Sequence, residues 1–309
     1  MAWSGAPWAL QRPASATPDA TESASWRIDI KRGTLLAPGA PLDGPGPFVP
    51  ALAPGVSEAA TSLLAELSRP ESVLTRRLGN NGLDALSVVL WIHGGCFTRG
   101  DSSWSTPFVD ALTADGHSHV YTVDFPQGAK HPWPQALPAL LAAFDNLRSS
   151  YSSEVPIVVG GESSGAFYAA WIAGTFPDAC AGCIGVAPVL DPAKRHERLG
   201  ESKRAMQEAY FGPNLQAASR TLWDDLLPRI KRCLCLLGAN DTDATLCLES
   251  MPLGTTIMTF SGKSHADMCS RPGLGVTSNI VQWVDGVRQR ARRDGDSVWS
   301  SDEESGSAE

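Results

Sequence analysis

The stretch IVVGGESSGAFYAAW, residues 157–171, decides the fold. Its β-branched start predicts a buried strand, and the small and aromatic residues at its end predict a helix. Between them lies Gly161-Glu162-Ser163-Ser164-Gly165. This is the G-x-S-x-G pattern of a nucleophile elbow, in which a serine occupies a sharp, strained turn from strand to helix. We expect the two glycines to let strand and helix approach closely.

Outward from this stretch, strands alternate with helices. The expected strands cover residues 26–36, 86–92, 119–125, 155–160, 183–190, 232–238 and 254–260. The expected helices cover residues 56–68, 104–115, 133–151, 164–176, 242–250 and 277–292, with a mostly helical insertion at 191–230. A hairpin-like pair of strands, 72–79 and 85–92, is expected around a turn at residues 80–82. The alternation predicts an α/β fold, a doubly wound, mostly parallel sheet covered on both faces, with the insertion as a helical cap.

The composition fits one large α/β domain. The chain has 309 residues, of which 43% are hydrophobic and 19% charged, enough for a substantial core. We place the domain at residues 26–295, between a loosely ordered N-terminus, 1–25, and an acidic tail, 296–309, expected to be disordered. The net charge of −8 argues against nucleic acid as a partner. No apolar run is long enough to predict a membrane span.

Seven cysteines bear on the compartment. Their odd number, and the lack of a secretory signal pattern at the start of the sequence, favour reduced thiols in the cytoplasm. Cys180-x-x-Cys183 and Cys233-x-Cys235 have spacings that metal or redox sites use. Both pairs lie in or beside apolar, strand-like runs, so we interpret them as small buried hydrophobic residues.

A serine hydroxyl needs a base to take its proton and an acid to orient that base. In this architecture the chain order is serine, acid, histidine. Of six histidines, only His265 follows both Ser163 and a candidate acid, and we expect it in a loop after the last strand. The acid belongs in the loop after strand 232–238, where Asp241 and Asp243 are both available. We favour Asp241, three residues after Gly238, and expect Asp243 to cap the next helix.

Acyl transfer also needs donors for the oxyanion that develops on the carbonyl. The segment WIHGGCF, residues 91–97, places glycines directly after a predicted strand, with backbone N–H groups open toward the serine. The N–H of Ser164, directly after the nucleophile, is a further donor. We expect His93 to hold this loop in place rather than to transfer protons.

Three segments, HGGCF…RGD, VDFPQGAKHPWPQAL and GESSG, resemble the hormone-sensitive-lipase-like branch of the α/β-hydrolase superfamily over about residues 70–270. The most telling match is HPWPQAL, His131 to Leu137, because no catalytic need dictates it. The resemblance implies a serine esterase that needs no cofactor and acts on a small ester. It implies the following site: Ser163 as nucleophile, Asp241 as acid, His265 as base, and an oxyanion hole from the backbone of Gly94, Gly95, Cys96 and Ser164, with Gly95 and Cys96 the stronger candidates.

The sequence also departs from that branch, which leaves two alternatives open. Cys96 replaces the third glycine of the motif, Glu162 replaces its aspartate, and FPQGAK lacks the expected arginine and glutamate. H-G-G-x-aromatic also resembles arylformamidases, which hydrolyse the amide of N-formylkynurenine. The gibberellin receptors of the same branch are catalytically silent, but they lack the histidine.

The cap offers side chains for an acyl or aryl pocket. Ordinary packing between cap and sheet explains them equally well. These side chains belong to Met206, Tyr210, Phe211, Trp223 and Leu226, with Phe97 and Trp104 near the oxyanion loop.

Overall fold

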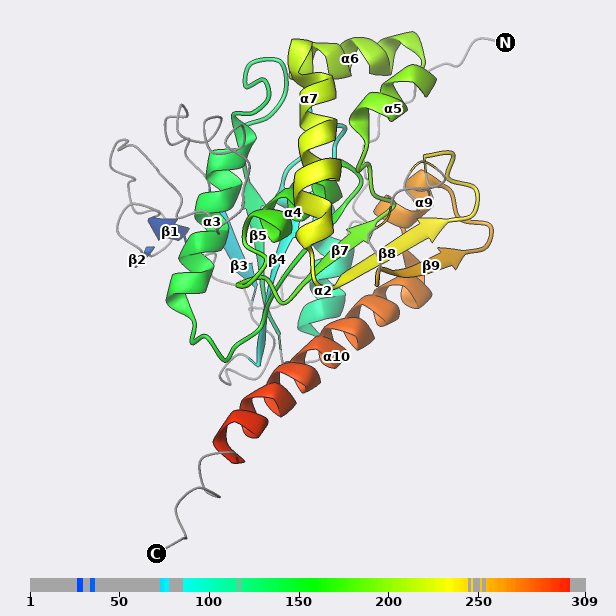
Figure 1. Ribbon diagram of the computed structural model, residues 1–309. Coiled ribbons are helices and arrows are strands. Elements are labelled where there is room, and N and C mark those ends of the chain that lie inside the picture. The colour runs from blue at the N-terminus through cyan, green and yellow to red at the C-terminus, as the bar shows by residue number, and fades with distance from the viewer. Residues whose placement is uncertain are drawn as a thin grey trace, which may run out of the picture.

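The computed structural model describes residues 86–114, 116, 118–243, 246, 251 and 254–293, and the backbone of residues 27–29, 34–36, 73–77 and 294–300. A seven-stranded sheet forms its centre, in the order β3-β5-β4-β6-β7-β8-β9 (Figure 1). The strands are β3 (Val73–Arg77), β4 (Ser87–Ile92), β5 (Ser118–Asp124), β6 (Ile157–Glu162), β7 (Gly182–Val186), β8 (Cys233–Gly238) and β9 (Thr256–Phe260). The six strands from β4 to β9 are parallel, and β3 is antiparallel to β5. The predicted fold class is confirmed.

Helices cover both faces of this sheet. They are η1 (Ser102–Ser105), α2 (Thr106–Thr113), α3 (Ala136–Ser150), α4 (Ser164–Thr175), α9 (His265–Ser270) and α10 (Gly273–Ser300). Helices α3 and α4 pack on one face over a core rich in aromatic side chains. Helices α2 and α10 pack on the other face over Val, Ile and Leu side chains. Burial on both faces explains why the central strands are almost wholly apolar.

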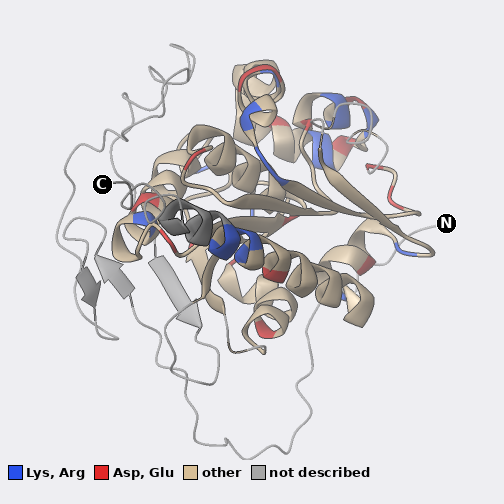
Figure 2. Cartoon of the chain, turned by 60° about the horizontal axis from the view of Figure 1, so that its bottom comes forward, with Lys and Arg blue, Asp and Glu red and all other residues tan. Residues whose placement is uncertain are grey.

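Charge is nearly absent from the six parallel strands (Figure 2). The two acidic residues in them, Asp124 and Glu162, are the last residues of β5 and β6. Asp124 accepts hydrogen bonds from the backbone N–H and the hydroxyl of Ser102, at the start of η1. The acidic side chains of these strands therefore lie at the carboxyl ends, where ligands bind in open parallel sheets.

The insertion after β7 forms a cap of short helices. They are α5 (Pro192–Arg198), α6 (Glu201–Phe211), η2 (Gly212–Asn214), α7 (Leu215–Arg220), the π-helical η3 (Thr221–Leu226) and η4 (Leu227–Arg229). Helices α5 and α6 lie above the sheet in Figure 1. The backbone N–H of Trp133 donates to the carbonyl of Tyr210 at 2.8 Å. The indole of Trp133 packs against Trp171 of α4 and Phe211 of α6. The HPWP segment therefore joins the cap to the elbow helix.

Two predicted strand arrangements are wrong. Strand β3 does not form a hairpin with β4, because β5 and β6 already occupy both edges of β4. The free edge of β5 pairs with β3 instead. The single opening strand predicted at residues 26–36 is a pair of short antiparallel strands, β1 (Arg27–Asp29) and β2 (Thr34–Leu36).

The C-terminal part also differs from prediction. The segment expected as loop before residue 277 contains α9 and the start of α10. Helix α10 runs on to Ser300, past residue 295 where we placed the end of the domain, and no proline interrupts it. The N-terminus 1–25, the helix 56–68, the turn 80–82, most of the helix 242–250 and the tail 301–309 lie outside the described residues. Among the described helices, none combines the length and apolarity that a membrane crossing requires.

Candidate active site

Ser163 lies at the turn from β6 to α4, with a positive φ of 55°. A β-carbon on Gly165 would lie 2.1 Å from the carbonyl oxygen of Ile92, and one on Gly161 would lie 2.5 Å from the carbonyl carbon of Gly165. Both glycines are therefore required by the close approach of strand and helix, as predicted. The left-handed backbone at Ser163 is strained, which is typical of functional turns.

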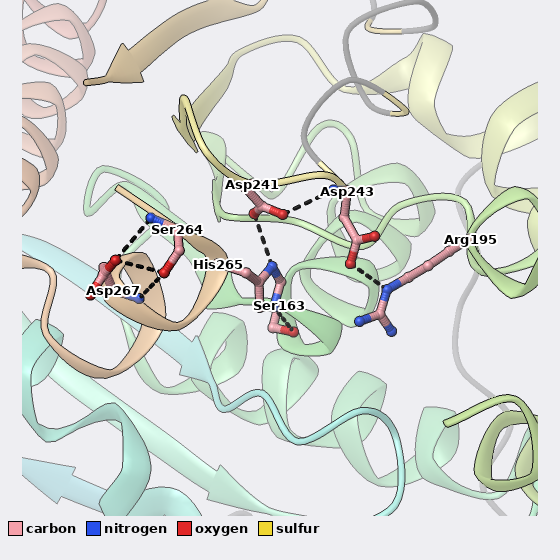
Figure 3. Close-up of polar contacts among 7 residues, drawn as sticks. All are labelled: Ser163, Arg195, Asp241, Asp243, Ser264, His265 and Asp267. Atoms are coloured by element: carbon pink, nitrogen blue, oxygen red, sulfur yellow. Dashed lines mark hydrogen bonds and ion pairs between the residues drawn. The ribbon is translucent and has the colours of Figure 1, made fainter. Parts of the chain in front are cut away.

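Ser163, His265 and Asp241 form one hydrogen-bonded chain (Figure 3). Ser163 Oγ lies 2.9 Å from His265 Nε2, and His265 Nδ1 lies 2.9 Å from Asp241 Oδ2. The side chain of Asp241 is 2% exposed, whereas that of His265 is 29% exposed. The carboxylate is thus shielded behind an imidazole whose other nitrogen reaches the serine.

The ends of β8 and β9 bring Asp241 and His265 together. The backbone N–H of Asn240 donates to the carbonyl of Lys263, and a β-carbon on Gly238 would lie 2.3 Å from that same carbonyl oxygen. His265 is the first residue of α9, not a loop residue as predicted. Ser264 caps this helix in a capping box with Asp267, whose pKa these hydrogen bonds lower. The capping box fixes the backbone of His265 beside the acid loop, the loop after β8 that contains Asp241.

Asp243, the alternative acid, makes different contacts. Its backbone N–H donates to Asp241 Oδ1 at 3.0 Å, and its carboxylate accepts from Arg195 Nε at 2.6 Å. A cap on the following helix cannot be compared, because most of that helix lies outside the described residues. The structure therefore joins Asp241 to His265 and joins Asp243 to the cap helix α5.

The oxyanion loop after β4 has an unusual backbone. Gly95, Cys96 and Phe97 all have positive φ angles, of 138°, 57° and 68°. The N–H of Gly94 donates to Glu162 Oε1, and the N–H of Phe97 donates to Ser164 Oγ. Within the described residues, the N–H groups of Gly95, Cys96 and Ser164 make no hydrogen bond. Three of the four expected donors thus have no partner among the described residues, whereas the N–H of Gly94 is occupied by Glu162.

Glu162, beside Ser163, is a buried carboxyl group held by three donors. Trp91 Nε1 donates to it at 2.6 Å, the N–H of Gly94 at 3.1 Å and Ser105 Oγ at 3.1 Å. Burial raises its pKa from 4.5 to about 7, against the opposing effect of these hydrogen bonds. Glu162 therefore ties the oxyanion loop to the residue before the serine.

His93 holds the same loop from the other side. Its Nδ1 lies 2.7 Å from the carbonyl oxygen of Gly94, and its ring stacks on Phe125 at 4.8 Å. Burial lowers its pKa. These contacts agree with the role predicted for His93.

Most of the side chains considered for a substrate pocket are core residues. Tyr210, Phe211 and Leu226 are at most 1% exposed, and Phe97 packs against Tyr210 and Phe211. Trp104, in contrast, is 47% exposed. Packing between cap and sheet therefore explains this aromatic cluster.

The paired cysteines are also core residues. Cys180, Cys183, Cys233 and Cys235 are buried thiols, and burial raises the pKa of Cys180 to about 12. In the described part of the chain, the group able to hold a metal ion consists of Asp241, Asp243 and His265, not of cysteines. The interpretation of these thiols as small buried hydrophobic residues fits their positions.

Sequence reasoning missed Arg195, Trp91 and Ser105. Trp91 and Ser105 bind Glu162 from β4 and η1, far from it in the sequence. Arg195 is one basic residue among several in the segment PAKRHER. It is 4% exposed, whereas Lys194 and Arg198 on the same helix are exposed. Only the packing of the cap distinguishes it.

Comparisons with known proteins agree with this architecture. Residues 89–247, just over half of the chain, match the family Abhydrolase_3, described as alpha/beta hydrolase fold. An esterase of Acinetobacter venetianus is 28% identical over 82 residues, which are 26% of this chain and 27% of that protein. The match thus spans about a quarter of that relative's length.

Solved structures resemble the chain over a larger share. A Pyrobaculum calidifontis esterase has a TM-score of 0.59 at 17% identity, covering 71% of this chain and 81% of that one. A Rhizomucor miehei esterase has a TM-score of 0.58 at 17% identity, covering 72% and 80%. At this identity the structures show a shared fold. The family match over residues 89–247 shows that the chain belongs to the hormone-sensitive-lipase-like Abhydrolase_3 family of α/β-hydrolase fold proteins.

Proposed function

We propose that the protein is a serine hydrolase that cleaves small carboxylic esters through an acyl-enzyme on Ser163. The observation that carries the proposal is the hydrogen-bonded chain from Ser163 through His265 to Asp241, with 2.9 Å at each step. The esterase relative of Acinetobacter venetianus adds support. We also propose a reducing compartment such as the cytoplasm, in line with the thiol state of the six described cysteines.

In the first half of the reaction, Ser163 Oγ attacks the ester carbonyl carbon while His265 Nε2 takes the hydroxyl proton. Asp241 accepts from His265 Nδ1–H, which fixes the tautomer and stabilises the imidazolium. The N–H groups of Gly95, Cys96 and Ser164 bind the oxyanion, and each such donor contributes about 3 kcal/mol. The tetrahedral intermediate then expels the alcohol, which takes the proton from His265.

In the second half, water attacks the acyl-enzyme. His265 takes a proton from the water as its oxygen bonds to the acyl carbon. The carboxylic acid leaves, and Ser163 recovers its proton from His265. The catalytic roles of these residues require no metal or organic cofactor.

The test is labelling with a fluorophosphonate probe and mapping of the modified peptide. We expect stoichiometric modification of Ser163, and loss of both labelling and p-nitrophenyl butyrate turnover in Ser163→Ala with the fold retained by circular dichroism. Ser150→Ala is the matched control, because it removes an exposed serine hydroxyl that donates only to the carbonyl of Asn146. Turnover that persists in Ser163→Ala, or labelling at another residue, would overturn the proposal.

The same reaction steps would cleave a formamide, so turnover of N-formylkynurenine is compared with that of short esters. A folded protein that neither takes the probe nor hydrolyses either substrate would favour a binding protein.

A further inference from the structure

Arg195 is a buried cation at the junction of the cap and the acid loop. Its side chain is 5% exposed, and its Nε donates to Asp243 Oδ2 at 2.6 Å. A guanidinium group carries five N–H donors in a planar fork. The contact with Asp243 engages the donor on Nε and leaves the four on Nη1 and Nη2.

Those terminal nitrogens, Nη1 and Nη2 of Arg195, have no partner in the part of the chain that the structure describes. They are also not among the buried polar atoms that are sealed from solvent without a partner. Neither nitrogen is therefore sealed from solvent, although the residue as a whole is buried.

The Arg195–Asp243 pair adjoins the Ser163–His265–Asp241 chain. A carboxylate oxygen of Asp243 lies within 4.8 Å of the ligand atoms of both Asp241 and His265. Figure 3 shows the guanidinium of Arg195 directed away from Asp241, on the side of Asp243 where Ser163 lies. These steps place the guanidinium beside the histidine that contacts Ser163.

The helix that carries Arg195 is firmly held. Asp191 caps it by accepting from the N–H of Lys194, and the N–H of Ala193 donates to Ser219 Oγ of α7. Gln207 Nε2 of α6 donates to the carbonyl of Pro192. A donor pair on such a support is preorganised, so little conformational entropy is lost when a ligand binds.

The neighbouring charges decide which ligand fits. Asp243 is compensated by Arg195 Nε, and Asp241 accepts from His265 Nδ1 and the N–H of Asp243. Neither carboxylate occupies the Nη1–Nη2 edge, which matches the two oxygens of a carboxylate end-on. The positive charge is shared with Asp243, so recognition depends on the two donors more than on net charge.

Building on the proposed function, we propose that Arg195 recognises a carboxylate of the substrate, so that the protein hydrolyses esters or amides that carry a second, anionic group near the scissile bond. The carboxylate can belong to the acyl part, as in a half-ester of a dicarboxylic acid, or to the leaving group. Both sources present the same chemistry to Nη1 and Nη2.

The test compares anionic substrates with neutral isosteres. For the acyl side, kcat/KM is measured for monoethyl glutarate and ethyl valerate; for the leaving-group side, for 4-(butyryloxy)butyrate and pentyl butyrate. We expect the wild-type protein to prefer the anionic member of one pair. Arg195→Gln should lower that anionic-to-neutral ratio by about tenfold or more, mainly through KM, because a charge-assisted hydrogen bond is lost. Arg195→Lys should retain part of the preference.

Two variants separate recognition from folding. Arg195→Gln leaves Asp243 unpaired, so the double variant Arg195→Gln with Asp243→Asn removes both charges together and should show the same loss of ratio. Arg198→Gln removes an exposed arginine from the same helix and should keep the wild-type ratio. A ratio that is equal in wild type and both Arg195 variants, in both pairs, overturns the inference.

Failure of the inference is distinguishable from failure of the proposed function. If the fluorophosphonate labels Ser163 and the ratio ignores Arg195, only the inference falls. If Ser163 takes no label and no ester is cleaved, the proposed function falls, and calorimetric titration with glutarate tests the carboxylate site alone. Glutarate should then bind the wild-type protein more tightly than the double variant, and equal binding would overturn the inference.

Discussion

Two carboxylates flank the Ser163–His265 pair, and their surroundings differ in kind. Glu162 is enclosed by donors from β4, the oxyanion loop and η1. These hydrogen bonds connect the three segments at the end of the sheet. Asp241 is equally buried, yet it bonds outward to a half-exposed imidazole and, through the N–H of Asp243, to the loop that meets the cap. One carboxylate belongs to the rigid end of the sheet, and the other to the contact between sheet and cap.

The difference between the two carboxylates indicates a separate role for each region. Under the proposed function, the Glu162 region sets where the carbonyl oxygen binds, because Glu162 joins Gly94 to the serine turn. Under the same proposal, the Asp241 region orients the base and, through Asp243 and Arg195, connects it to the cap. Substitutions in the first region should change stability and its pH dependence, and substitutions in the second should change turnover.

The largest effect is expected from the two acids of the second region. Asp241→Asn should lower kcat/KM for p-nitrophenyl butyrate by about 10³- to 10⁴-fold, because the amide favours the wrong imidazole tautomer. Asp243→Asn should cost no more than about tenfold, since Asp243 contacts Arg195 rather than His265. Steady-state kinetics on the two folded variants decide between them. A larger loss in Asp243→Asn would assign the acid to Asp243.

The next effect concerns Glu162 and the pH dependence of folding. Its pKa is about 7 in the folded protein and about 4.5 when exposed, so between these values the folded state holds a proton that the unfolded state has released. Its contribution to stability therefore falls as pH rises from about 4.5 to 7 and is constant above that. The free energy of unfolding falls by about 3 kcal/mol over this pH range because of Glu162.

Glu162→Gln removes this titration and keeps the side-chain shape. The free energy of unfolding, from urea denaturation between pH 4.5 and 8, should show the wild-type protein losing stability relative to the variant as pH rises. Other titrating groups are common to both proteins and cancel in the difference. A difference that stays constant over this range would mean that Glu162 does not titrate there.

Much of this frame was predictable from sequence, for local reasons. Residues 157–165 carry both the strand and the turn, and the glycines report the close approach of Ile92 directly. The neighbours of a strand are not encoded this way. A turn signal at residues 80–82 follows the segment 72–79 and points toward β4, but only the sheet as a whole shows that both edges of β4 are occupied and that β3 pairs with β5.

The residues of the candidate site likewise differ in whether the sequence could predict them. Ser163, Asp241 and His265 follow strand ends in a fixed chain order, so their proximity could be predicted. The bond between Asp243 and Arg195 joins residues 48 positions apart, one of them in an insertion without a repeating pattern. Which basic residue of α5 turns inward depends on how α5 packs against α6 and α7, and no spacing in the sequence expresses that packing.

The smallest effect returns to the oxyanion loop. Cys96 has a φ of 57°, where a β-carbon costs about 1 kcal/mol, so Cys96→Gly should raise the free energy of unfolding by about that amount, less the extra freedom of glycine in the unfolded chain. Cys96→Ala keeps the β-carbon and removes the thiol, so it isolates the backbone effect. Urea denaturation should place the glycine variant above the alanine variant. Equal stability of the two would mean that the freedom of glycine in the unfolded chain fully offsets the backbone strain at Cys96.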